Sequence, residues 1–358
     1  MNATVLTINS QRFDEKELRQ FSGQKLQDQH TASWEKDIYG FILDWLDPSQ
    51  SIIQYSSGTT GKSKKLQLLK KSMLRSAENT CRYFNLTKDQ SALLCLPVEY
   101  IAGKMMVIRC IVAGMQLQMI EPKSRLDFSG IPSVDFTAMV PLQLANLLKN
   151  LPHFPEIKKI LVGGTEITPE LVNQLNKVPA EVFASFGMAE TCSHVALRRL
   201  NGPDQQDDYH ALPEIHLEQD ERGCLVIAAD YLPQKVVTND LVQFTSPGSF
   251  IWLGRFDNLI NSGGIKVVPE ELEKGIRKET GLECAIIGLP DKKLGQRLIL
   301  VAEKRRIATK EPGLRSSLKK LLPAKLNIRD IVLIDKLPRN RALKLDRRKL
   351  AEMVSPML

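Results

Sequence analysis

The stretch YSSGTTGKSK, residues 55–64, decides how the rest of this sequence is interpreted. Its glycines let the backbone approach an anion closely, and its hydroxyl and lysine side chains donate hydrogen bonds to phosphate oxygens. A short apolar strand over 51–55 precedes it, and a helix with Leu69, Met73, Ala77 and Cys81 on one side follows it. The pattern therefore predicts a phosphate-binding loop framed by a strand and a helix, rather than a plain Ser/Gly linker.

This loop differs from a Walker A loop, which requires G-x-x-x-x-G-K-[ST]. Counting back from Gly61-Lys62-Ser63 places the first glycine of that motif at position 56, where this chain has Ser56. The chemistry suits phosphate, but the spacing does not fit the P-loop proteins.

Length and composition indicate a folded α/β protein. The chain has 358 residues, of which 43% are hydrophobic and 25% charged, values that exclude disorder and collagen-like structure. The six cysteines are scattered without a CxxC pair, which predicts free thiols and no zinc site. The sequence has no apolar run long enough to span a membrane, and its start does not resemble a secretory signal, so we expect a cytoplasmic protein.

Alternating strands and helices predict a parallel or mixed sheet with helices on both faces, after a helical first fifty residues. The expected strands lie at 91–96, 116–119, 138–140, 160–162 and 181–184, and the expected helices at 14–27, 34–45, 103–113, 142–148 and 169–175. After Cys192, a small β-rich module is expected, with strands at 225–229, 235–237, 241–244 and 249–253. A second, small α/β domain follows, with elements at 269–280, 283–288, 298–303, 313–321 and 330–334.

The net charge of +8 is unevenly distributed. From residue 258 onward there are 23 Lys and Arg against 12 Asp and Glu, whereas the preceding residues have 26 against 29. This asymmetry indicates either contact with a polyanion, such as a coenzyme phosphate or nucleic acid, or a solvated basic surface. The basic region has no Phe, Trp or Tyr, so it lacks the stacking platforms of single-strand binders.

Eight segments in order, from Tyr55 to Leu345, resemble the motifs of the adenylate-forming superfamily, which includes acyl-CoA synthetases and luciferases. The phosphate loop of that family is usually Y-[TS]-S-G-[TS]-T-G-x-P-K-G, and Lys64 matches its lysine. The other segments are LPVEYIAG at 96–103, LVGGTE at 161–166, SFGMAET at 185–191, TND at 238–240, GRFD at 254–257, the run from Asn261 to Glu271, and PRNRALKL at 338–345. Departures from the family pattern include Ser63, Lys65, Tyr100, Ala189, Asn239 and Leu343, where the family usually has Pro, Gly, His, Thr, Gly and Gly.

The resemblance implies a site for ATP, Mg²⁺ and an acid. Phosphate contacts would come from Ser56, Ser57, Gly58, Thr59, Thr60, Gly61, Lys62 and Lys64. The adenine would lie along Gly163, Gly164 and Thr165 and against Ser185, Phe186, Gly187 and Met188, with Asp240 and Arg255 at the ribose and phosphate. Glu190 would be the Mg²⁺ ligand and would act in catalysis with Lys344, and Asp257 would be the hinge. Tyr100, Arg109 and Gly187 would contact the acid.

The family fold implies an N-terminal adenylation domain over 1–256, shortened at its start, and a mobile domain over 257–358. The implied reaction activates a carboxylic acid as acyl-AMP and transfers it to coenzyme A. The small size and two of the segments most resemble o-succinylbenzoate–CoA ligases of menaquinone biosynthesis. Another acyl-CoA synthetase, an enzyme that loads a carrier protein and a basic nucleic-acid-binding protein are the alternatives. Expected partners are the acid, ATP and coenzyme A, without nucleic acid or membrane span, and homo-oligomerisation is left open.

One basic residue bears on the choice of acid. The helix over 103–113 is apolar except for Lys104 and Arg109, and a buried arginine needs an anionic partner. In the o-succinylbenzoate ligases a basic residue occupies the corresponding helix, which implies that Arg109 holds the second carboxylate of the substrate. The alternative is a structural salt bridge to a carboxylate of the protein.

Overall fold

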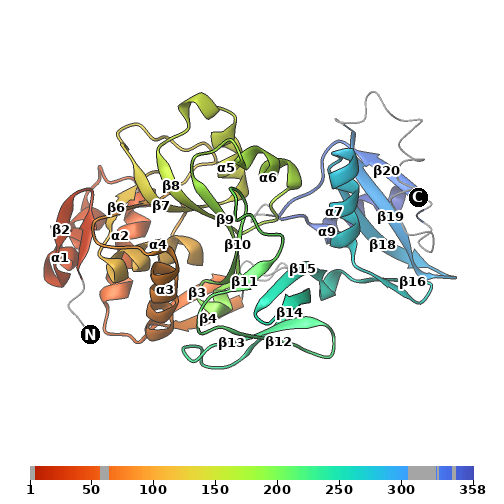
Figure 1. The fold of residues 1–358 in the computed structure, drawn as a ribbon, viewed down its shortest axis with the longest axis horizontal. Helices are drawn as coiled ribbons and strands as arrows, with labels where there is room; N and C mark the ends of the chain where they lie inside the picture. The colour runs from red at the N-terminus through yellow and green to blue at the C-terminus, as the bar shows by residue number, and fades with distance from the viewer. Residues whose placement is uncertain (1–4, 57–63, 305–327, 329, 341–343) are drawn as a thin grey trace. The chain divides into compact units, whose positions relative to one another are not determined.

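The fold comes from a computed structural model whose described residues are 5–56, 64–304, 328, 330–340 and 344–358. The chain divides into two compact units (Figure 1). Unit 1 comprises Met1–Leu217, Ile227–Val236 and Pro247–Ser249, and unit 2 comprises Glu218–Val226, Val237–Ser246 and Phe250–Leu358. The domain boundary expected between residues 256 and 257 stays a prediction.

Unit 1 is built on a mixed sheet. Its strands are β1 Leu6–Ile8, β2 Gln11–Phe13, β5 Ser91–Leu94, β6 Gln116–Met119, β7 Val134–Met139, β8 Ile157–Val162, β9 Glu181–Gly187, β10 His194–Arg199 and β11 Tyr209–Ala211. Within this unit they lie in the order β11-β10-β9-β8-β7-β5-β6-β1-β2. The pairs among β5, β6, β7, β8 and β9 are parallel, as is β1 with β6, whereas β10 runs antiparallel to β9. The predicted mixed α/β class is confirmed.

Helices cover both faces of this sheet, as predicted. They are α1 Glu15–Gln27, α2 Ser33–Leu46, α3 Lys70–Phe84, α4 Ile101–Ala113, α5 Pro141–Leu148 and α6 Pro169–Leu175. Strand β9 illustrates the alternation, because Val182 and Ala184 belong to the core cluster that contains the apolar residues of α5 and α6. Between them, Phe183 points to the other face, where its ring centroid lies 5.0 Å from that of Phe84 in α3.

The structure corrects two expectations for the first seventy residues. The beginning of the chain is not wholly helical, because β1 and β2 form a hairpin that pairs with β6. The phosphate loop is followed by a strand rather than directly by a helix. Strand β4, Lys64–Leu69, pairs antiparallel with β3, Ser51–Ser56, and buries Leu68 beside Ile52 before α3 begins.

The module after Cys192 contains β12 His216–Gln219, β13 Cys224–Ala228, β14 Val236–Ser246 and β15 Ser249–Arg255. The expectation of separate strands at 235–237 and 241–244 is wrong, since β14 runs through both. The polar residues Thr238 and Asp240, which lie between the two expected strands, are both buried inside β14. Hydrogen bonds satisfy their side chains there, including one from the Asp240 amide to Thr238 Oγ1 at 3.0 Å.

The C-terminal part of unit 2 packs a helix on each face of a small sheet. Its elements are β16 Ile260–Ser262, β17 Ile265–Val267, α7 Pro269–Thr280, β18 Cys284–Asp291, β19 Gly295–Glu303, β20 Asp330–Ile334 and α9 Arg347–Val354. Along β18, Ile286 packs in the cluster with Ile276 of α7, and Ile287 packs with Leu350 of α9. The alternation is the one expected for an α/β arrangement, whereas the separate second domain stays a prediction and the helix predicted at 313–321 lies outside the described residues.

Short 3₁₀ helices complete the described secondary structure: η1 Leu151–His153, η2 Ala189–Thr191, η3 Phe256–Asn258 and η5 Ser355–Met357. All six cysteines are buried free thiols, as predicted. In the described ranges, no helix has both the length and the apolar character needed to cross a membrane.

A buried ion pair joins α9 to α7. The Arg347 guanidinium donates to both carboxylate oxygens of Glu273, at 2.7 and 2.8 Å, and to the Ile286 carbonyl at 2.9 Å. Glu273 also accepts from the Ile286 amide at 2.6 Å and is 4% exposed. Because its charge is almost fully desolvated, Glu273 depends on Arg347 for compensation.

We expect Arg347→Met to destabilise the protein by about 3–5 kcal/mol, because it leaves the Glu273 carboxylate buried and uncompensated. The matched control is Arg348→Met, since the Arg348 side chain is 88% exposed and pairs with Glu352 one turn away. The control should change the free energy of unfolding by less than about 1 kcal/mol. Denaturant titration of the two variants measures the difference, and equal losses would contradict a buried pair.

Candidate active site

The segment that leaves β8 turns tightly beside the end of β9. A Cβ added to Gly163 would lie 2.2 Å from Ser185 Oγ, and that hydroxyl donates to the Val162 carbonyl at 3.1 Å. Gly164 has a φ of +91°, a conformation that side-chain-bearing residues rarely adopt. The glycines therefore leave bare backbone at the carboxyl ends of two parallel strands, which is where open α/β sheets bind ligands.

The next turn holds Gly187 and Met188 in place. A Cβ on Gly187 would lie 2.3 Å from the Ser193 carbonyl oxygen, so the segment has no room for a side chain there. The Met188 amide donates to Thr191 Oγ1 at 3.1 Å, and the Thr191 hydroxyl lies 2.7 Å from the Ser193 carbonyl oxygen. These bonds fix the shape of the loop that carries η2.

This loop presents Phe186 and Glu190. Phe186 is half-buried, and its ring lies 5.8 Å from that of Tyr209 in an edge-on arrangement. Such a partly covered ring keeps a surface against which a flat base can pack. Thr165, across the turn from β8, is half-buried as well.

Glu190 is a half-buried carboxylate in η2. Over the described ranges, no three His, Cys, Asp or Glu side chains come together as a metal site. Magnesium in nucleotide enzymes is typically held by one or two carboxylates together with substrate phosphates and water. Glu190 fits that mode of Mg²⁺ binding. The described residues do not form a site in which protein side chains alone would surround the metal.

Arg109, in α4, is 2% exposed and lies beside the residues that follow this loop. Its Nη2 donates to Ser193 Oγ at 2.5 Å and lies 3.3 Å from His194 Nδ1, and its Nη1 lies 3.6 Å from Met106 Sδ. Its Nε has no hydrogen-bond partner among the described residues. Nor does any carboxylate in the part of the chain that the structure describes form an ion pair with this guanidinium.

The neutral state of His194 allows this arrangement. Burial is the main cause that lowers its pKa well below the ordinary value, and the charge of Arg109 adds to it. The Thr80 hydroxyl donates to the Ser76 carbonyl and lies 3.3 Å from His194 Nε2, so it accepts from that nitrogen. Nδ1 is then the unprotonated nitrogen that faces Arg109. Burial also lowers the pKa of Arg109 to about 10, which leaves it charged at neutral pH.

In unit 2, Asp240 is buried on β14. Its Oδ1 accepts from Trp252 Nε1 at 2.9 Å, and its Oδ2 accepts from Arg255 Nη1 at 3.3 Å. The other terminal nitrogen of Arg255 donates to Asp257 in η3 at 2.8 Å. Arg255 therefore bridges two of the carboxylates that the sequence singled out.

Lys344 lies near the same group. Its amide donates to Asn340 Oδ1 at 3.0 Å and its carbonyl accepts from the Asn340 amide at 2.8 Å, which closes a tight turn. Desolvation lowers the pKa of the Lys344 ammonium, the charge of Arg255 lowers it further, and Asp240 opposes both. Unit 2 thus brings Lys344, Arg255, Asp240 and Asp257 together, although 104 positions separate Asp240 from Lys344.

Most of the phosphate loop is not described. Ser57, Gly58, Thr59, Thr60, Gly61 and Lys62 lie outside the described residues. The two ends of the loop are paired, since Ser56 of β3 lies opposite Lys64 of β4. Tyr100 precedes α4 and is 41% exposed.

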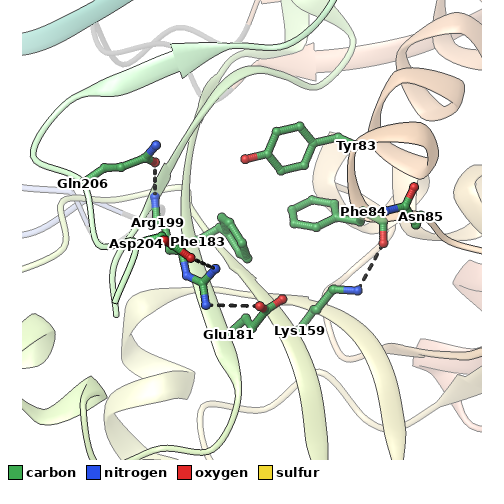
Figure 2. Close-up of a pocket in the computed structure, with 9 residues that line it drawn as sticks. All are labelled: Tyr83, Phe84, Asn85, Lys159, Glu181, Phe183, Arg199, Asp204 and Gln206. Carbon is green, nitrogen blue, oxygen red and sulfur yellow. Dashed lines mark hydrogen bonds and ion pairs between the residues drawn. The ribbon is translucent and has the colours of Figure 1, made fainter. Parts of the chain in front are cut away.

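Unit 1 also has a cavity of about 380 Å³ that is not this site, and Figure 2 shows the residues that line it. Arg199 pairs there with Glu181 at 3.1 Å and with Asp204 at 3.3 Å, and Lys159 donates to the Phe84 carbonyl at 3.1 Å. Lys159 and Glu181 lie in the first halves of β8 and β9, at the opposite end from Gly163 and Gly187. The charged side chains of Arg199 and Lys159 in this cavity therefore already bind other groups of the protein.

Comparison with known proteins identifies the family to which the chain belongs. The AMP-binding enzyme family matches residues 2–216 of the chain. The chain therefore belongs to the AMP-binding enzymes. A structure described as an acyl-CoA synthetase (AMP-forming)/AMP-acid ligase II-like protein from Dyadobacter fermentans is 32% identical, with a TM-score of 0.61, and the match covers 94% of this chain and 98% of that one.

Two further proteins are similar to this chain. The 2-succinylbenzoate–CoA ligase of Haemophilus influenzae is 26% identical over 286 residues, which cover 75% of this chain and 62% of that protein. The o-succinylbenzoate coenzyme A synthetase of Bacillus subtilis in complex with ATP and magnesium shares the fold, with 20% identity, a TM-score of 0.74 and coverage of 97% and 96%. The chain spans about three fifths of the length of the first curated relatives that it matches.

The sequence motifs did not point to several side chains of the site. Ser193 and His194 complete the surroundings of Arg109, and Trp252 holds Asp240. The position of Ser193 and His194, two and three residues after the SFGMAET segment, was a usable signal. Nothing in the local sequence marks Trp252, since its contact depends on the pairing of two strands.

The close approach of Gly163 to Ser185 can be tested with a double-mutant cycle. Gly163→Ala should destabilise the protein by about 1–3 kcal/mol through overpacking against Ser185 Oγ. Ser185→Ala removes that oxygen, so the double variant should recover part of the loss, with a coupling of about 1 kcal/mol. Unfolding free energies of the four proteins measure this coupling, and strictly additive losses would contradict the contact.

Gly187→Ala provides the matched comparison. Its added methyl would meet backbone atoms of Ser193 and His194, which no side-chain truncation removes. Ser185→Ala should therefore not rescue it.

Proposed function

We propose that this protein is an AMP-forming acid–CoA ligase. It activates a carboxylic acid with ATP as an acyl-adenylate and transfers the acyl group to the thiol of coenzyme A. Membership of the AMP-binding enzymes and the order of the eight segments support this proposal. The charges of Asp240 and Arg255, which pair with one another, act on Lys344, and this agrees with a candidate catalytic lysine in the neighbourhood of candidate nucleotide ligands.

In the first half-reaction, a carboxylate oxygen of the acid attacks the α-phosphorus of ATP, the bond to the β-phosphate oxygen breaks, and pyrophosphate leaves. Asp240 accepts hydrogen bonds from the ribose hydroxyls, and Phe186 packs against the adenine beside Gly163 and Gly164. Lys344 stabilises negative charge on the transferring phosphate, an electrostatic and positioning role. Bound Mg²⁺ neutralises phosphate charge, and Glu190 would hold it.

In the second half-reaction, the thiolate sulfur attacks the acyl carbon, the bond from that carbon to the AMP oxygen breaks, and AMP leaves. The family implies a rotation about Asp257 between the two half-reactions. The excess of basic residues from position 258 onward, 23 against 12 acidic ones, suits the phosphates of coenzyme A. Formation of an acyl-CoA product distinguishes this enzyme from one that loads a carrier protein.

We infer that the acid is o-succinylbenzoate, and the observation that carries this choice is Arg109. Its charge is buried among neutral groups, the Ser193 hydroxyl and the unprotonated nitrogen of His194, with Nε unpartnered. A buried cation without a counter-ion is costly, and a second carboxylate on the substrate would compensate it. Curated relatives named 2-succinylbenzoate–CoA ligase favour the same acid. The cytoplasmic location expected from the sequence stays a prediction.

A panel of carboxylic acids assayed for AMP release with coenzyme A tests the proposed function. We expect o-succinylbenzoate to give the highest kcat/KM and a coenzyme A thioester as product. If none of the acids supports pyrophosphate exchange, the ligase assignment is contradicted. Nucleic-acid binding is then the alternative function to test.

Lys344→Ala should abolish adenylate formation and leave the conversion of preformed acyl-adenylate to thioester nearly unchanged. The reason is that Lys344 acts on the phosphates of ATP, which the second half-reaction no longer contains. Pyrophosphate exchange and single-turnover thioester formation measure the two steps. The control Lys336→Ala, at an exposed position, should behave like the wild type in both. Equal losses in the two steps would argue against a role confined to adenylation.

Arg109→Leu should lower kcat/KM for o-succinylbenzoate by about 30-fold to several thousand-fold, the effect of losing one partner of a desolvated charge pair. A monocarboxylate analogue that lacks the second acid should be nearly insensitive to the change, and the KM for ATP should stay close to wild type. Arg109→Lys keeps the charge and should retain part of the activity. Equal losses with both acids, together with a lower melting temperature, would indicate a structural role instead.

A further inference from the structure

Asn239 makes a contact that the family's usual glycine at this position has no side chain to make. Its Nδ2 donates to both carboxylate oxygens of Asp257, at 3.0 and 3.2 Å. Asp257 also accepts from Arg255 at 2.8 Å, so two side chains hold the same carboxylate from different strands. Asp257 is the residue that the family resemblance singles out as the hinge.

Arg222 fixes the amide of Asn239 in this orientation. Its Nη1 donates to Asn239 Oδ1 at 2.9 Å, and its Nη2 donates to the Thr238 carbonyl at 3.0 Å. Its Nε donates to Asp220 at 2.9 Å, and its guanidinium lies 5.1 Å from the centre of the Phe256 ring. Because Arg222 occupies Oδ1, the amide nitrogen of Asn239 is the end that faces Asp257.

The contacts form a continuous chain across unit 2. Arg222 holds Asn239, Asn239 and Arg255 hold Asp257, and Arg255 also holds Asp240, whose charge acts on Lys344. A change in the backbone torsions at Asp257 redirects every residue after it, including Lys344. It also moves the Asp257 carboxylate away from the Asn239 amide. The bonds from Asn239 therefore stabilise one of the orientations that the hinge can adopt.

We propose that Asn239 is a positioning residue that holds Asp257 in the orientation in which Lys344 lies near Asp240. This inference rests on the proposed function. It adds that the protein favours the hinge orientation in which Lys344 would act in adenylate formation. Without the Asn239 side chain, a larger fraction of molecules would adopt other hinge orientations, and the rate of the first half-reaction would fall. Since Asp257 is partly exposed, with 44% of its side chain accessible, the shift is moderate.

Asn239→Ala tests this inference. Asn239→Gly, which restores the family's usual residue, is a second variant in case Asn239→Ala folds poorly. The ratio of the adenylation rate to the rate of thioester formation from preformed acyl-adenylate should fall about three- to tenfold. A residue that only supported the fold would lower both rates by the same factor. Arg222→Leu should lower the ratio in the same direction, because it frees the Asn239 amide to rotate.

Hydrogen exchange of the backbone over residues 254–260 provides a readout that needs no activity. It should become faster in Asn239→Ala and stay unchanged in the matched control Asn176→Ala, an exposed position of unit 1. Equal changes in the two rates, or unchanged exchange over 254–260, overturn the inference. If the wild type catalyses neither half-reaction, the proposed function fails, and the exchange measurement still decides whether Asn239 restrains Asp257.

Discussion

The lack of space between the ends of β8 and β9 is the constraint on which the candidate site of unit 1 depends. These parallel strands end side by side, and a side chain on Gly163 would crowd Ser185 of β9, while one on Gly187 would crowd the backbone of Ser193 and His194. Backbone amides and small polar groups are therefore exposed at this edge of the sheet. The same crowding brings the Ser193 hydroxyl and His194 against α4, where they meet the guanidinium of Arg109.

Charge compensation organises the candidate residues of unit 2 in a different way. Acidic and basic groups alternate from Asp240 through Arg255 to Asp257, and Lys344 lies near the first two. Arg255 is paired with the carboxylates of Asp240 and Asp257, whereas Arg109 in unit 1 faces neutral groups among the described residues. A carboxylate of the acid would compensate the charge of Arg109. Asp240 and Arg255, which already pair with one another, are proposed instead for the ribose and phosphate of the nucleotide.

Much of the site was predictable because its chemistry is encoded in short segments. The glycines of LVGGTE and the SFGMAET stretch were recognised from local residue types, and both lie at strand ends as expected. The TND segment was recognised by the resemblance, but its strand was not, since polar residues are typical of a break. Trp252 and Arg255 satisfy those polar groups from the neighbouring strand, a contact that no local pattern reveals.

The sequence by itself determined the class of fold, the order of the motifs and the residue types suited to phosphate, because periodicity and glycine placement act over a few neighbouring positions. The tertiary structure decided which of these residues meet. Arg109 lies 84 positions from Ser193, and Asn239 lies 18 positions from Asp257, yet each pair is joined by hydrogen bonds. Such contacts depend on strand register and on the direction in which a turn leaves its strand. Both are set by the packing of the whole sheet, so the state of a buried charge or of a hinge follows only from the folded chain.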